Sequence, residues 1–164
     1  MSIVTIPRVV AALISLALGF WFAFNPKRIW KKDNATVFEY VFDKLSAKSD
    51  YGFDLSCLND HETVFMSMAL LVQEVNNGGY DQFFLNLGDR YNDILVSSAE
   101  AIKALDIAKI CEKALAIYAE HAEQEDPIEE LGECDDAFYA STDAICDLCA
   151  QYAREHKGNF KFKK

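Results

Sequence analysis

The densest group of residues that could do chemistry is a run of carboxylates in the second half of the chain. Residues 120–136 hold nine carboxylates within seventeen positions, and the only residue among them that could become positive is His121. We take these nine as candidate partner-binding residues: Glu120, Glu123, Glu125, Asp126, Glu129, Glu130, Glu133, Asp135 and Asp136.

The spacing of this carboxylate row suggests contact with cationic side chains. Carboxylates four residues apart on a helix lie about 6 Å apart along its axis, because each residue rises 1.5 Å. Phosphates on one nucleic-acid strand are about 3.4 Å apart along the helix axis, which is the same order of distance. A rigid row could therefore contact lysine and arginine side chains that otherwise grip phosphates. The alternative is a solvated face that only keeps the protein soluble.

Catalytic chemistry has weaker support in the sequence. His61, His121 and His156 are scattered, and no pair of them lies four residues apart around a glutamate as in helical zinc proteases. No glutamate has a histidine three residues later, as di-metal helical bundles require. Gly78 and Gly79 follow a helical pattern, whereas an anion-binding loop would precede one. We therefore expect no enzymatic activity, no catalytic residue and no cofactor.

The five cysteines are most simply explained as thiols packed in the interior. An odd number of cysteines argues against a secreted domain built on disulfides. Cys146 and Cys149 form a C-x-x-C pair, but they lie within a helical pattern and not after a strand, where redox pairs sit. Two alternatives are a redox role and a zinc site using Cys134, Cys146, Cys149 and His156. Our prediction is that no metal is bound.

Charge divides the 164-residue chain into three parts. Its net charge of -10 hides five basic and no acidic residues in 1–32, and four lysines in 157–164. The 33–156 body holds the other 7 basic and all 26 acidic residues, a net of -19. We predict an N-terminal anchor with a basic flank, an acidic helical domain and a basic tail. Such a body repels nucleic acid and attracts basic proteins, so no direct nucleic-acid binding is expected.

The N-terminal part predicts a membrane anchor. Residues 9–24 are sixteen uncharged, mostly apolar residues, and counting from 3 to 24 gives 22 residues, or about 33 Å of helix. More basic residues follow this segment than precede it, which predicts a single-pass inner-membrane protein with its acidic domain in the cytoplasm. Alternatives are a cleaved signal peptide, a helix that is buried or forms a homodimer, and a soluble cytoplasmic protein.

The pattern along the body predicts an all-α fold. Val64, Met68, Leu71, Val72 and Val75 form one apolar helical face. Adjacent glycines then break the helix, because one of them can adopt a left-handed conformation without a Cβ clash. Helices are expected near 34–48, 61–77, 82–88, 92–105, 107–122 and 133–156, with Asn59 or Asp60 as the cap of the second and Asp106 as the cap of the fifth. Phe83 and Phe84 are expected in the core, and Gln82 and Asn86, four residues apart, are expected close together at the break. The architecture is one bundle-like domain of about six helices behind the N-terminal hydrophobic helix.

The break also carries a family resemblance. The run NNGGYDQFFLNLGD, followed by SSAEAIKALD, resembles a DNA-mimic protein family marked by an NGG-x-x-Q-F-F-x-N signature, from about residue 60 to 156. The residues of this signature here are Asn77, Gly78, Gly79, Gln82, Phe83, Phe84 and Asn86. The resemblance implies an all-α domain without enzymatic activity and, in the type member, an acidic surface that occupies DNA-binding proteins.

These observations lead to one main functional hypothesis and one rival. The main hypothesis is a non-catalytic protein-binding domain whose carboxylate row mimics DNA and fills the cationic groove of a basic, DNA-binding protein. The rival is a partner-specific interaction protein, for instance a neutraliser of one effector, whose acidity only keeps it soluble.

Overall fold

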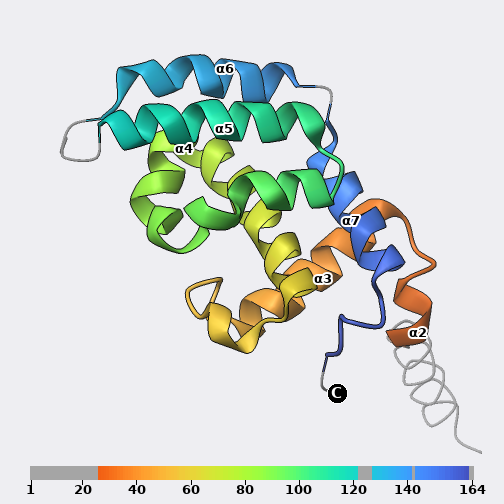
Figure 1. Ribbon diagram of the computed structural model, residues 1–164. Coiled ribbons are helices and arrows are strands. Elements are labelled where there is room, and N and C mark those ends of the chain that lie inside the picture. Colours follow the sequence, from red (N-terminus) through yellow and green to blue (C-terminus); the bar gives the residue numbers. More distant parts are fainter. Residues whose placement is uncertain (1–25, 122–126, 142, 163–164) are drawn as a thin grey trace, which may run out of the picture.

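The computed structural model describes residues 26–121, 127–141 and 143–162, and within these ranges all regular structure is helical (Figure 1). The helices are α2 (Pro26–Ile29), α3 (Asn34–Lys48), the 3-10 turn η1 (Leu55–Cys57), α4 (Asp60–Ala101), α5 (Leu105–Glu120), the 3-10 turn η2 (Glu129–Leu131), α6 (Gly132–Ala140) and α7 (Ile145–Glu155).

Helix α4 is the element against which the others pack. It is kinked at Gly78 and Gly79, so it consists of a first half and a second half that run in different directions. Helices α5 and α6 lie side by side at one end of the molecule, and α3 and α7 lie side by side at the other (Figure 1). Both pairs contact α4, which therefore links the two ends.

The core follows the apolar face predicted from the sequence. Met68, Leu71 and Val75 of the first half of α4 are buried, while Val64 and Val72 are half-buried against the same cluster. Each large apolar side chain that is removed from water contributes about 1.5–3 kcal/mol. The fully buried large side chains also include Phe65, Met66, Tyr80, Phe83, Tyr91, Leu95 and Ile107, together with Leu45 from α3.

The two helices that follow loops near residues 33 and 59 have caps from their own sequence. Asp33 accepts a hydrogen bond from the Thr36 amide at 2.9 Å, so α3 starts one residue after this cap. Of the two predicted caps, Asn59 and Asp60, it is Asn59 that caps α4, and it forms a capping box with Glu62. These caps satisfy amides that a helix start otherwise leaves without partners.

Helix α5 begins differently from the sequence prediction, in which Asp106 is the cap. The helix starts at Leu105, and its cap comes from the loop before α7. There the Asp143 carboxylate accepts from the Asp106 amide at 3.0 Å and from the Ile107 amide at 3.2 Å. Asp143, which lies 36 and 37 residues after these two amides in the chain, therefore takes the place of a local cap.

Both ends of the described chain are tied together by Arg154 of α7. Its guanidinium donates to the backbone oxygens of Trp30 at 3.2 Å and Lys32 at 2.7 Å, and to the Asn34 side chain at 2.5 Å. Next to this contact the Phe160 ring is buried and lies 6.2 Å, centroid to centroid, from that of Trp30. The segment after α7 is therefore packed onto the start of α3.

The predicted bundle of about six helices behind a transmembrane helix needs correction. Within the described ranges, five helices have nine residues or more, from α3 to α7. The predicted helices at 82–88 and 92–105 together form the second half of α4, because Gly88 keeps helical geometry and is buried within it, and the predicted helix at 61–77 is the first half. The predicted helix at 133–156 is two helices, α6 and α7, with a break that begins at Ser141.

The membrane anchor also needs correction. Among residues 26–121, 127–141 and 143–162, no helix has both the length and the apolar character that a bilayer span requires. The predicted span at 3–24 lies outside these residues. No described helix therefore supports the predicted transmembrane helix or the single-pass inner-membrane location. The physical weakness of the prediction is length: the uncharged run has sixteen residues, whereas a spanning helix needs about 20.

Candidate protein-binding surface

The kink of α4 at Gly78 and Gly79, called the elbow below, is built on two glycines, as predicted. Gly78 is extended (φ -169°), and Gly79 has a φ of +78°. A Cβ atom on Gly79 would lie 2.3 Å from Oδ2 of Asp135, a distance that real Cβ contacts do not reach. Both the backbone conformation and the close approach of α6 therefore require glycine at this position.

Asp135 of α6 caps the second half of α4. Its Oδ1 accepts a hydrogen bond from the Tyr80 amide at 2.8 Å, so the carboxylate faces the elbow. Burial raises the pKa of Asp135 above its ordinary value, against the opposing effect of the Tyr80 hydrogen bond. One member of the carboxylate row is therefore half-buried and turned toward the elbow, where it satisfies the start of a helix.

Other signature residues complete the elbow. The Asn86 amide donates to the buried Glu74 carboxylate at 2.8 Å, so Asn86 bonds across the elbow to the first half of α4 and not to Gln82. Phe83 and Phe84 are buried as predicted, and the Phe84 ring stacks on that of Tyr118 in α5 at 4.3 Å. Asn77 is exposed, and Gln82 lies beside Gly78. Among them, Phe84 packs the second half of α4 against α5.

Helix α6 also closes the elbow from the other side. The Tyr139 hydroxyl donates to the Val75 carbonyl at 2.6 Å, which satisfies an acceptor near the end of the first half of α4. Sequence reasoning missed Glu74, Asp135 and Tyr139 as elbow residues. Their partners lie 12 to 64 residues away, so no local pattern marks them.

The described part of the carboxylate row lies at the α5–η2–α6 end of the molecule. Glu120 is at the end of α5, Glu129 and Glu130 are in η2, and Glu133 and Asp136 are exposed on α6. Glu123, Glu125 and Asp126 lie outside the described residues.

Only some of these carboxylates are free of cationic partners. Glu133 accepts from Lys113 Nζ at 2.8 Å, and this hydrogen bond lowers the pKa of Glu133 and raises that of Lys113. Glu130 lies 3.8 Å from the His121 ring nitrogen. In the described ranges this leaves Glu120, Glu129 and Asp136 exposed without a salt bridge. The described members of the row are therefore divided between paired and unpaired carboxylates.

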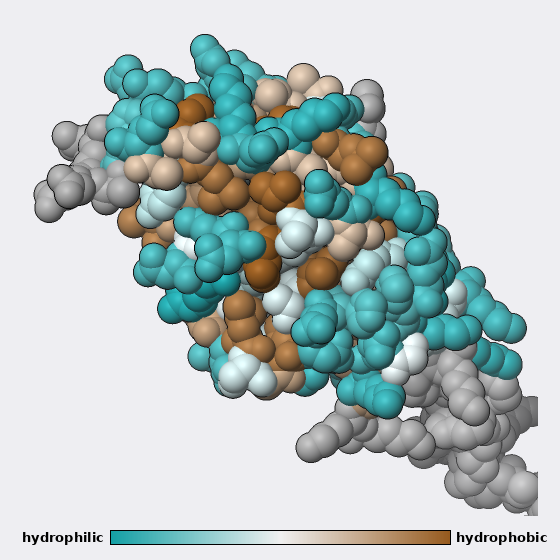
Figure 2. All heavy atoms as spheres, in the orientation of Figure 1, coloured by the Kyte–Doolittle hydropathy of each residue, from teal (hydrophilic) through white to brown (hydrophobic). Residues whose placement is uncertain are grey.

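Apolar side chains are exposed alongside the charged ones. Figure 2 shows one face on which hydrophobic residues are visible between hydrophilic ones. On the two helices that meet at the elbow, Leu85 is 78% exposed and Tyr139 is 57% exposed. Apolar and aromatic residues are typical of the centre of protein–protein interfaces, whereas charges gather at the rim.

Three of the five cysteines fit the predicted packing role, whereas Cys57 and Cys146 are only half-buried. Cys111, Cys134 and Cys149 are buried and unpaired, and burial raises their pKa values, for Cys111 to about 12. Such thiols remain protonated near neutral pH, so they are poor nucleophiles. In the part of the chain that the structure describes, no group of three or more acidic, cysteine or histidine side chains could hold a metal ion.

Comparison with protein families gives one match. A family model described as DMP19-like protein matches residues 56–156, which is more than half of the chain. Comparisons with curated proteins and with solved structures give no match. The matched range contains α4 to α7, including the elbow and the carboxylate row. The chain belongs to the DMP19-like protein family.

Proposed function

We propose that this member of the DMP19-like family is a protein-binding domain that occupies one specific partner through the α5–η2–α6 end. The family is a DNA-mimic family, so its members act through binding surfaces and not through catalysis. The family match supports neither membrane contact through residues 3–24 nor a homodimer. We place the binding surface within the acidic body at residues 33–156.

The observation that carries this proposal is that the carboxylates have different partners. Asp135 bonds to the elbow and Glu133 is paired with Lys113, which leaves Glu120, Glu129 and Asp136 exposed without a salt bridge on α5, η2 and α6, and α6 also carries the exposed Tyr139. A surface of this kind selects a partner by shape and apolar contact at its centre, and by charge at its rim.

DNA mimicry is the second candidate function. Two observations favour it: the family assignment and the net charge of -19 over residues 33–156. A mimic of this kind would bind many basic, DNA-binding proteins. Its binding would depend on charge and would weaken as salt screens the carboxylates.

An affinity-capture experiment separates the two functions. The full-length protein is immobilised, and proteins captured from lysate at low and at high salt are identified by mass spectrometry. Partner-specific binding predicts one protein that is retained at high salt. Mimicry predicts a set of basic proteins that is released together as the ionic strength rises.

A charge-neutralised variant tests the role of the row. The variant replaces Glu120, Glu129, Glu130 and Asp136 by the corresponding amides. Its matched control neutralises four exposed carboxylates elsewhere, namely Glu39, Asp89, Asp93 and Glu100.

Under partner-specific binding, the row variant keeps its partner with a slower association rate, and the control behaves as wild type. Loss of all capture in the row variant alone would favour mimicry. Equal loss in both variants would show that only net charge matters, and the proposed surface would be wrong.

A further inference from the structure

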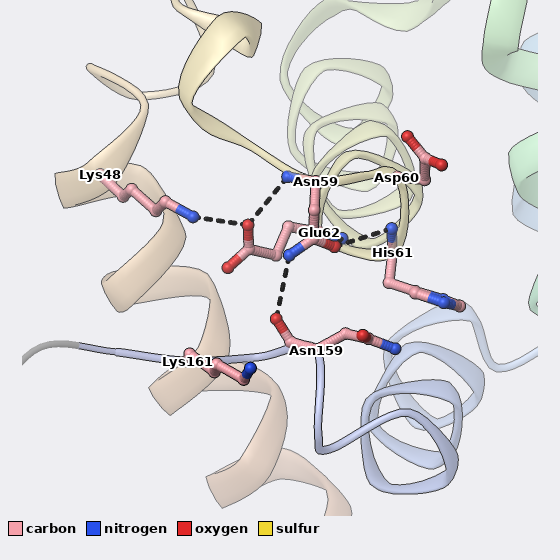
Figure 3. Close-up of a pocket in the computed structure, with 7 residues that line it drawn as sticks. All are labelled: Lys48, Asn59, Asp60, His61, Glu62, Asn159 and Lys161. Atoms are coloured by element: carbon pink, nitrogen blue, oxygen red, sulfur yellow. Dashed lines mark hydrogen bonds and ion pairs between the residues drawn. The ribbon is translucent and has the colours of Figure 1, made fainter.

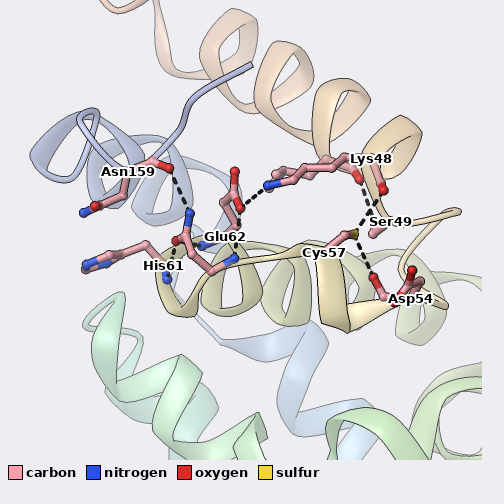
Figure 4. A network of polar contacts seen from close by, with 9 residues as sticks. Lys48, Ser49, Asp54, Cys57, His61, Glu62 and Asn159 are labelled. Atoms are coloured by element: carbon pink, nitrogen blue, oxygen red, sulfur yellow. Dashed lines mark hydrogen bonds and ion pairs between the residues drawn. The ribbon is translucent and has the colours of Figure 1, made fainter. Parts of the chain in front are cut away.

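A second feature lies at the other end of α4, where Glu62 is buried. Its Oε2 accepts from Lys48 Nζ at 2.5 Å and from the Asn59 amide at 3.0 Å. Its Oε1 is also buried, but no donor among the described residues reaches it (Figures 3 and 4). A buried carboxylate oxygen without a donor is costly, and a ligand that donates to it would recover that cost.

This carboxylate lines a cleft of about 440 Å³. The cleft is formed by the end of α3, the start of α4 and the segment that carries Asn159 and Lys161. Figure 3 shows the Glu62 carboxylate directed toward the space between α3 and that segment. The volume is within the range of small-molecule sites, about 300–1,000 Å³.

The remaining polar groups limit the chemistry of a ligand. The Asn59 side chain has little left to offer except one N–H, since Oδ1 accepts from the His61 and Glu62 amides and Nδ2 donates to the Asn159 carbonyl. Asp60 and Lys161 also line the cleft, and both side chains are exposed. Hydrogen bonding therefore favours a ligand with a donor for Glu62 and an acceptor for Lys161.

The charges of the cleft lining favour the same kind of ligand. Lys48 and Glu62 neutralise each other as an ion pair, so the other two charges of the lining, the Asp60 carboxylate and the Lys161 ammonium, decide which ligand is attracted. A simple cation would be attracted by the first and repelled by the second, and the reverse holds for a simple anion. A molecule with one charge of each sign can satisfy both groups.

We propose that this cleft binds a small zwitterion of the α-amino acid class. The ammonium group donates to Oε1 of Glu62, and the carboxylate accepts from Nζ of Lys161. The site is independent of the proposed partner surface, because that surface lies at the α5–η2–α6 end and the cleft at the α3–α7 end.

Three matched probes test this proposal with the full-length protein. L-alanine carries both charges, ethylammonium lacks the carboxylate, and propionate lacks the ammonium group. Each is titrated against the protein at one ionic strength while the backbone amide NMR signals of Asn59, Glu62 and Lys161 are followed. We expect alanine to bind roughly tenfold more tightly than either of the other probes, because each supplies only one of the two charge-assisted hydrogen bonds.

Two variants and a control assign the roles. Lys161→Met should remove the advantage of alanine over ethylammonium, and Glu62→Gln should remove its advantage over propionate. Lys157→Met, an exposed lysine outside the cleft lining, should leave all three titrations unchanged. If Glu62→Gln does not fold, the Lys161→Met titration and the three-probe comparison still test whether the cleft binds an α-amino acid.

Several results would overturn the proposal. No saturable shift with alanine would show that the cleft does not take an α-amino acid. Equal binding of alanine and either single-charge probe would show that the paired charges are not recognised. Unchanged alanine binding in Lys161→Met would also contradict it.

Discussion

The start of the first half of α4 is capped by residues next to it in the sequence, whereas the start of the second half is capped by a side chain of another helix, α6. Asn59 and Glu62 form a box within four residues, and this box can exist as soon as the first turn does. The Tyr80 amide instead bonds to Asp135, 55 residues later, and needs α6 in place. The second half of α4, and the candidate surface beside it, therefore depends on tertiary packing for a contact that the first half has locally.

The largest expected effect is at the elbow glycine. Gly79→Ala would force an alanine to φ +78° and place its Cβ against the Asp135 carboxylate, so we expect a loss of roughly 2–4 kcal/mol in the free energy of unfolding. Urea denaturation measures it. Gly132→Ala is the control, because a Cβ there meets nothing within 4 Å and the backbone is helical.

A double variant separates the clash from the backbone strain. If the Asp135 carboxylate is the obstacle, Gly79→Ala combined with Asp135→Ala should cost less than the sum of the two single changes. Additive costs would mean that the conformation of Gly79 alone requires glycine, and that the close approach of α6 does not matter.

The next effect concerns the remote cap itself. Asp135→Ala leaves the Tyr80 amide without its acceptor, and we expect a loss of roughly 1–2 kcal/mol in the free energy of unfolding. Asp136→Ala, at an exposed neighbouring site, should stay within about 0.5 kcal/mol of wild type. Native-state hydrogen exchange should show faster exchange at Tyr80 in the first variant and no change near Asn59. Faster exchange at both starts of α4 would contradict the independence of the two caps.

A smaller effect is expected at the second remote cap. Asp143→Ala removes the acceptor for the Asp106 and Ile107 amides at the start of α5, at a cost of about 1 kcal/mol. Thermal unfolding followed by circular dichroism measures the change. Glu112→Ala, on the exposed middle of α5, is the matched control. A cost no larger than that of the control would show that water replaces Asp143 at this helix start.

The smallest expected effect is a dependence on pH. Burial raises the pKa of Asp135 in the folded protein above its ordinary value of 3.8, so the folded state binds this proton more tightly than the unfolded chain does. The stability of wild type relative to Asp135→Asn should therefore fall as the pH rises through 3.8 to the raised pKa, and then stay level. Paired urea titrations across this interval measure the difference. A rise over the same interval would mean that the Tyr80 hydrogen bond outweighs burial.

The same contrast explains what the sequence could predict. The Asn59 cap, the glycine break at residues 78 and 79 and the buried Phe83 and Phe84 follow from neighbours in the chain, and the structure confirms them. The elbow roles of Asp135 and the cap at Asp143 depend on partners far along the chain. Composition placed Asp135 in an acidic surface row, because composition carries no information on which way a side chain faces.

The cleft was missed for a related reason. Glu62 is visible in the sequence as a first-turn glutamate, but its burial requires Lys48 from α3 and the segment after α7. The membrane prediction has a different weakness, which is the length of the apolar segment. It extended an uncharged run of sixteen residues across Arg8 and Pro7 to reach a spanning length.

Arg154 sets a practical limit on how this protein can be shortened. Cutting at the borders of the family match, 56 and 156, would delete all three residues that its guanidinium contacts and leave a cation with nothing to neutralise or solvate it but water. The same cut would strip Val37, Val41 and Leu45 from one side of the interior and Phe160 from another. Expression of the domain for binding or crystallisation work should therefore keep at least residues 30 to 162.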